Sequence, residues 1–109
     1  MTHGVMSEEN ERERELRASL LRTLGAVYTS DLVAHLKRDA VIVVDPGISL
    51  IDCAVAIALD DKGKVAQWMC AGALRRATDD ERAQWPSEPS REWLAVVVQP
   101  FVLVQTPSN

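Results

Sequence analysis

Apolar positions in the first quarter of the chain recur with the spacing of an α-helix. They lie three or four residues apart, which places them on one face of a helix. Ser7 and the acidic residues after it suit a helix start, so the pattern predicts a helix over residues 7–28. Its first half is polar on every side. We expect that half to project into solvent while the second half docks, or else to contact a second copy. The docked stripe consists of Leu16, Leu20, Leu24 and Val27.

The middle of the chain alternates between strand and helix patterns. The β-branched run AVIVV at residues 40–44 is typical of a strand and is followed by the turn sequence DPG. Three apolar helical stretches each begin at a residue that suits an N-cap. These residues are Ser30, Ser49 and an aspartate at 60 or 61. Gly72 stands where the glycine that ends a helix belongs. The predicted elements are helix 31–39, strand 40–44, helix 49–59, helix 61–71 and strand 74–77.

The last third contains the strongest strand pattern of the chain. Thr78 and Glu81 form a capping box that starts a short helix, and residues 92–105, EWLAVVVQPFVLVQ, then predict one long strand. Pro100 has no N–H to donate, so we expect the strand to kink there or to lie at a sheet edge. A hairpin at Gln99 and Pro100 requires a cis turn and is the alternative.

The order of these elements is that of a winged helix-turn-helix domain: helix, strand, helix, helix, strand, strand. Val65, Trp68, Gly72 and Leu74 have the spacing of the second helix and exit of such domains, a packing pattern that specifies no base contact. We therefore predict an α+β fold with a winged-helix-turn-helix-like core preceded by a long N-terminal helix. Residues 7–105 form the predicted single domain, and residues 1–6 and 106–109 are predicted to be disordered tails.

The composition is that of an ordinary globular domain of 109 residues with a net charge of −4. A dedicated nucleic-acid-binding protein usually has a basic balance, so this charge counts against DNA as a partner. The start of the chain, MTHGVMSEENERERE, is charged and unlike a secretory signal, and no apolar run is long enough to cross a membrane. We expect a cytoplasmic protein in which Cys53 and Cys70 are reduced, with a disulfide between them as the alternative.

No pattern of catalytic, metal-binding or cofactor-binding residues stands out. Cys53 lies on the predicted inner face of its helix, and His35 has Asp39 four residues on, so packing explains both better than a nucleophile–base pair. The cysteines and histidines have none of the usual zinc spacings. Paired carboxylates such as Asp60 and Asp61 begin predicted helices, where they favour the first turn. We expect a non-enzymatic protein without a metal or cofactor.

Three ordered blocks resemble a family of small bacterial proteins catalogued as a domain of unknown function (2288). The blocks are HLKRDAVIVVDPGISLIDCAVAIALDD, VAQWMCAGAL and VVVQPFVLVQ. The resemblance covers most of residues 16–105. It implies a bacterial cytoplasmic protein and supplies no catalytic residue, cofactor or substrate.

Two functions stay open, a protein-interaction or assembly module and a DNA-binding regulator. An exposed strand edge, a projecting charged helix and Trp residues near loops favour pairing with a second copy or with another protein.

The DNA hypothesis uses helix 61–71 and the wing after it. Between residues 60 and 82, acidic and basic side chains are equal in number, five of each, and the acids repel phosphates. We therefore favour the module. The residues that would contact DNA are Lys62, Lys64, Gln67, Arg75 and Arg76.

Overall fold

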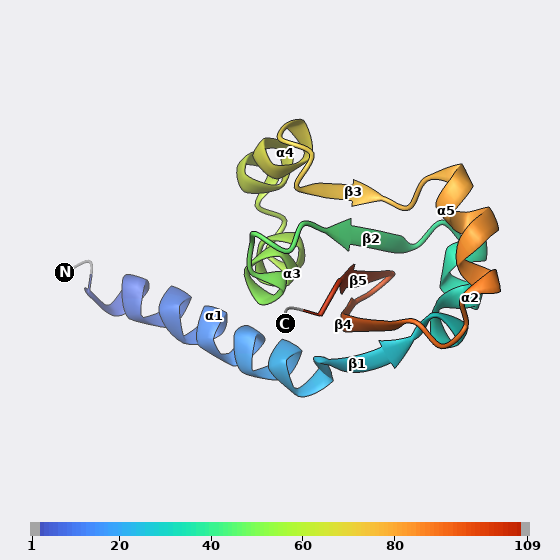
Figure 1. Ribbon diagram of the computed structural model, residues 1–109. Coiled ribbons are helices and arrows are strands. Elements are labelled where there is room, and N and C mark those ends of the chain that lie inside the picture. The colour runs from blue at the N-terminus through green and yellow to red at the C-terminus, as the bar shows by residue number, and fades with distance from the viewer. Residues whose placement is uncertain (1–2, 108–109) are drawn as a thin grey trace.

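The computed structural model describes residues 3–107 and shows a mixed α+β fold, in which one sheet lies between two groups of helices (Figure 1). The helices are α1 (His3–Thr23), α2 (Thr29–Lys37), α3 (Leu50–Ala58), α4 (Lys62–Cys70) and α5 (Asp79–Gln84), and a 3-10 turn η1 spans Trp85–Ser87. The strands are β1 (Gly25–Tyr28), β2 (Val41–Val44), β3 (Leu74–Arg76), β4 (Glu92–Val98) and β5 (Phe101–Gln105).

The five strands form one sheet in the order β1-β4-β5-β2-β3. β2 and β5 run parallel, with Val41 opposite Val102, and the other neighbouring pairs are antiparallel. The C-terminal strands β4 and β5 therefore lie inside the sheet, and β1 and β3 form its edges.

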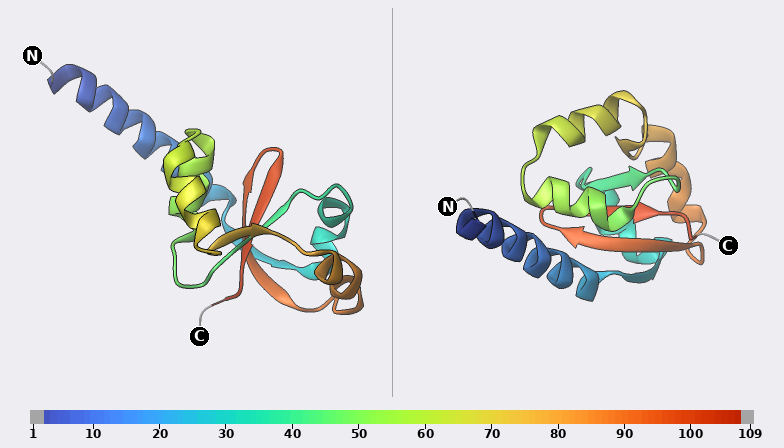
Figure 2. Two further views of the ribbon diagram at one scale, coloured as in Figure 1. Left: turned by 90° about the horizontal axis from the view of Figure 1, so that it is seen from above. Right: turned by 90° about the vertical axis from the view of Figure 1, so that its left-hand side faces the viewer.

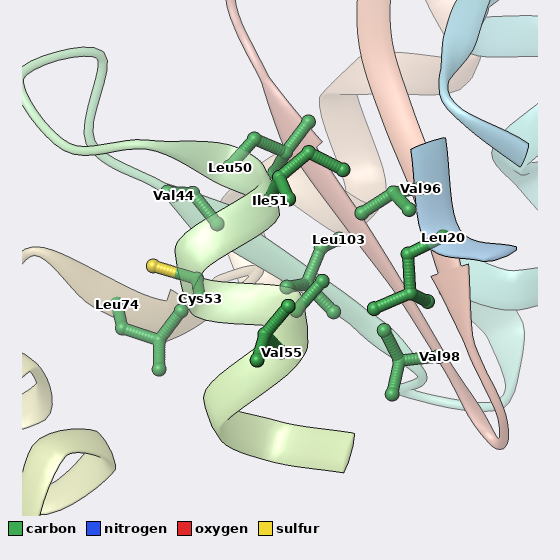
Figure 3. Close-up of a cluster of buried hydrophobic side chains, with 11 residues drawn as sticks. Leu20, Val44, Leu50, Ile51, Cys53, Val55, Leu74, Val96, Val98 and Leu103 are labelled. Carbon is green, nitrogen blue, oxygen red and sulfur yellow. The ribbon is translucent and has the colours of Figure 1, made fainter. Parts of the chain in front are cut away.

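Successive residues of the inner strands point to opposite faces of the sheet, and both faces are covered. Along β4, Val96 and Val98 belong to one buried cluster, whereas Trp93 and Ala95 belong to another. α1, α3 and α4 pack on the first face, here called the α3 face, and α2 and η1 pack on the second, the α2 face (Figure 2). Figure 3 shows the α3-face cluster, in which Leu103 of β5 lies beneath α3.

The helix ends that the sequence predicts from local side-chain chemistry are largely confirmed. The Ser49 hydroxyl accepts a hydrogen bond from the N–H of Asp52 at 3.1 Å, and the Asp61 carboxylate caps α4 in the same way. Thr78 and Glu81 form the predicted capping box at the start of α5. Gly72 ends α4 with a φ of 74°, a conformation that glycine adopts at little cost.

The N-terminal helix differs from its prediction at both ends. α1 begins at His3 rather than at Ser7, so residues 3–6, assigned above to a disordered tail, are helical. It ends at Thr23, and the next residues form β1 instead of two further helical turns. Residues 1–2 and 108–109 lie outside the described part of the chain. As predicted, the C-terminal half of α1 docks through Leu16 and Leu20, and the N-terminal half projects away from the sheet (Figure 1).

The start of α2 corrects a second prediction. The helix begins at Thr29, and its N-cap is Tyr28 rather than Ser30. The N–H of Tyr28 donates to the Asp31 carboxylate at 3.0 Å, which satisfies a backbone group at the point where β1 turns into α2.

The prediction of one long, kinked C-terminal strand is wrong. A cis peptide bond at Gln99–Pro100 turns the chain, and β4 and β5 pair as an antiparallel hairpin with Val98 opposite Phe101. Pro100 therefore lies in the turn, where its missing N–H interrupts no ladder. Because both strands have a neighbouring strand on each side, neither is an edge strand of the sheet, contrary to the feature used above to support an interaction module.

The α+β class is confirmed, whereas the winged-helix arrangement is not. β3 pairs with β2 and is followed by α5, so it forms no wing hairpin with the C-terminal strands. α2 packs on the face of the sheet opposite to α3 and α4 and therefore completes no three-helix bundle with them (Figure 2, left). A linear order of elements leaves the pairing partners of each strand undetermined, and here most of the pairings are non-local.

Candidate binding groove

An open cavity of about 170 Å³ lies on the α3 face, between α3, α4, β3 and the β4–β5 hairpin. The sheet supplies one side of it, and the two helices supply the other. Arg75 and Arg76 of β3 stand at its margin. We call this surface the α4 groove, and its apolar lining consists of Ile42, Ile57, Val65, Met69, Leu74 and Phe101.

The groove exists because α4 packs loosely on the rest of the protein. None of the nine residues of α4 is buried, and Val65 and Trp68 are its half-buried contacts with the core. The sequence KGKVAQWMC offers too few apolar residues for a wide buried stripe, so the helix touches the core along a narrow line. The helical spacing predicts that Met69 faces inward with Val65 and Trp68, but Met69 is 54% exposed at the edge of the groove.

Arg76 is held at the mouth of the groove by two neighbours. Its guanidinium donates to the Asp39 carboxylate at 2.9 Å and lies 6.0 Å from the centre of the Phe101 ring. Asp39 itself has a φ of 54° and also pairs with Arg82, so its position is constrained from both sides. The Arg76 side chain nevertheless remains 56% exposed, which leaves donors free for a further partner.

Arg75 points to the other face of the sheet. It stands opposite Val43, a residue that packs in the α2-face cluster, and cross-strand partners share a face. Its guanidinium donates two hydrogen bonds to Glu81, at 2.6 and 3.0 Å. These bonds raise the pKa of Arg75 and lower the pKa of Glu81 relative to their ordinary values. The Arg75 charge is therefore largely satisfied inside the protein.

The remaining residues of the DNA hypothesis lie on α4 and are exposed. The ammonium of Lys62 lies 4.0 Å from the carboxylate of Asp60, and Lys64 borders a separate polar cleft between α1, α3 and α4. The structure thus keeps Lys62, Lys64 and Gln67 on one helix but directs Arg75 to the opposite side of the sheet. The five predicted contact residues do not form one surface.

Cys53 and His35 also lie on opposite faces of the sheet. Cys53 is fully buried among the side chains of the α3-face cluster, as predicted (Figure 3). His35 lies on α2, where its Nδ1 contacts the guanidinium of Arg38 rather than Asp39. Both cysteines are free thiols, and Cys70 is exposed at the end of α4. Among the side chains that the structure describes, those of residues 11–107, no three histidine, cysteine or acidic side chains are grouped as a metal site would require.

Two of the three tryptophans anchor the core. The rings of Trp85 and Trp93 lie 4.6 Å apart and are 4% and 2% exposed, so neither is an interface anchor on the surface of this chain. Trp68, on α4, is half-buried against the α3-face cluster.

The fold and the groove together define a small α+β domain with an open apolar surface beside an edge strand. The chain belongs to the family described as "Protein of unknown function (DUF2288)", whose model matches residues 15–106. It is similar to the solution structure of PA1075 from Pseudomonas aeruginosa, with a TM-score of 0.72 and 31% sequence identity over 87% of each chain. No curated protein matches it. In the described residues, no helix is long and apolar enough to cross a membrane.

Proposed function

We propose that this protein is a protein-interaction or assembly module and that its binding site is the α4 groove. The observation that carries the proposal is a groove with a mostly half-buried apolar lining, which lies beneath a helix with no buried residue and has Met69 exposed at its edge. Contiguous exposed apolar surface is costly in water, and such surface marks binding sites in soluble proteins. Methionine, phenylalanine and arginine, all present here, are enriched at protein interfaces.

The chemistry of the groove also favours binding over catalysis. The polar side chains among its lining residues are two arginines, each already paired with an internal carboxylate. Arginine keeps its proton in proteins and is a poor acid–base catalyst. An apolar floor with a cationic margin suits recognition of a polypeptide segment.

Photocrosslinking tests the proposal directly. We replace Met69 with a photoreactive phenylalanine analogue and irradiate cells that produce the variant. We expect one or a few discrete crosslinked adducts, because Met69 stands at the groove margin. The matched control carries the same analogue at Gln67, an exposed residue of the same helix that does not line the groove. Absence of adducts from position 69, or an identical pattern from position 67, contradicts the proposal.

DNA is the weaker of the two hypotheses, and it leads to a separate prediction. We expect no salt-sensitive retardation of duplex DNA at low ionic strength. Arg75 lies on the opposite face of the sheet, where two of its donors are bound to Glu81, so it does not join the cations of α4 in contacting phosphates. A gel-shift titration with random duplexes at about 50 mM salt is the measurement. A shift that disappears in the double variant Lys62→Glu, Lys64→Glu would restore the DNA hypothesis.

A further inference from the structure

The charged side chain that faces the α4 groove is basic, although the net charge of the chain is −4. Among the described residues that line the groove, none is acidic. Arg76 faces the groove, whereas Arg75 directs its guanidinium to the α2 face. Lys62, on the first turn of α4, lies seven residues before Met69, on the same side of the helix. The groove therefore has an apolar floor and a basic side chain at its mouth.

The Arg76 guanidinium is positioned before any partner arrives. One of its nitrogens donates to Asp39, and its central carbon lies over the Phe101 ring, 6.0 Å from the ring centre. These contacts reduce the side-chain entropy that binding would otherwise cost, and the side chain remains more than half exposed. A planar guanidinium with free donors beside an apolar floor matches a carboxylate that is next to apolar side chains.

We infer that the partner segment is an acidic amphipathic peptide, whose apolar side chains fill the groove and whose carboxylate pairs with Arg76. This inference rests on the proposed function and specifies its partner. A second copy binding through the same surface is disfavoured, because a two-fold interface places each patch against its own equivalent and would bring the arginines together. The cavity volume of about 170 Å³ is also below the roughly 300–1,000 Å³ of typical small-molecule sites.

Selection from a random peptide library identifies the preferred chemistry. The full-length protein and its Arg76→Gln variant are each used to select displayed peptides. We expect the wild-type protein to enrich sequences that combine Asp or Glu with Leu, Ile, Phe or Met. The variant should lose the acidic enrichment and retain the apolar one. Circular dichroism on both proteins checks that the substitution, at a largely exposed side chain, leaves the fold intact.

Affinity measurements then test the role of Arg76. Fluorescence anisotropy with a selected acidic peptide should give about tenfold weaker binding for Arg76→Gln, typical of the loss of a charge-assisted hydrogen bond. Arg76→Lys should restore part of the affinity, because it keeps the charge but loses the planar donor pair. Arg22→Gln, which removes an exposed arginine of α1 outside the groove, should bind like the wild-type protein. Binding to the wild-type protein should weaken as salt is raised.

The possible failures are distinguishable. If no peptide class is enriched by the wild-type protein, the groove is not a peptide-binding site and the proposed function is contradicted. If apolar peptides without acids, or with basic residues, are enriched instead, the groove binds peptides but the inferred charge is wrong. If acidic peptides are enriched yet bind equally to Arg76→Gln, another cation carries the recognition and the assignment of Arg76 is overturned.

Discussion

Replacing Trp93 by alanine should lower the free energy of unfolding by about 3–5 kcal/mol, the range for removing a large buried aromatic side chain. Trp93 is 2% exposed and forms the centre of the α2-face cluster. Its ring packs against Trp85 on one side, and the guanidinium of Arg91 lies 4.2 Å from its centre. Its indole N–H donates to the hydroxyl of Thr29 at 3.0 Å. Alanine removes all of these contacts and leaves a cavity beneath α2.

Urea unfolding followed by circular dichroism measures this loss. Trp93→Phe is the matched control, because it keeps most of the apolar volume and removes the indole donor. We expect Trp93→Phe to cost clearly less than Trp93→Ala, with part of its cost arising from the Thr29 hydroxyl left without its donor. A loss below 1 kcal/mol for the alanine variant would show that the α2 face carries no real core, contrary to the two-sided sheet.

Side-chain chemistry within a few residues made the helix ends predictable. Ser49, Asp61 and Thr78 cap helices because their oxygens reach backbone N–H groups three residues on, and no distant contact is needed for that. Gly72 likewise ends α4 through its own backbone freedom. Asp61 and Gly72 also fix the path of the chain beside the groove, from the start of α4 to β3.

The strand pairing was not predictable in the same way. Val96 and Trp93 lie on opposite faces, and both are buried, so the run EWLAVVV lacks the polar alternation that reveals a one-sided strand. The leucine spacing of α1 also continues in register to Val27, which in the structure belongs to β1. Here pairing with β4 overrides the helical pattern, because tertiary contacts outweigh local propensity.

The groove was predictable in part. The low apolar content of KGKVAQWMC already indicates a helix that packs weakly on the core. From that signal, the exposure of Met69 at the edge of the groove follows. The position of Arg76 over Phe101 and beside Asp39 depends on residues 25 and 37 positions away in sequence. No local pattern contains that contact. Arg75 and Arg76, both named above as candidate DNA contacts, lie on different faces because adjacent residues of a strand point to opposite faces.

Cys53 should make the protein less stable at alkaline pH. Burial in the α3-face cluster, with a smaller effect from the neighbouring Asp52 carboxylate, raises the pKa of the Cys53 thiol from 9.0 to about 11. The unfolded chain therefore releases this proton at a lower pH than the folded protein does. Below pH 9 the thiol is neutral in both states, and its contribution to stability is fully present. Between pH 9 and 11 the thiol ionises more readily in the unfolded chain, which lowers the free energy of unfolding. The loss should reach about 2 kcal/mol by pH 11.

Urea unfolding of the wild-type protein and of Cys53→Ala at pH 8, 9.5 and 11 isolates this effect from other groups that titrate in the same range. The alanine variant starts from a lower stability, because it lacks a buried sulfur, but its stability should fall less steeply as the pH rises. Cys70→Ser, which changes the exposed cysteine of α4, should follow the wild-type dependence. Equal slopes for the wild-type protein and Cys53→Ala would mean that α3 opens far enough to hydrate the thiolate. A helix that opens in this way would also loosen the wall that Ile57 contributes to the α4 groove.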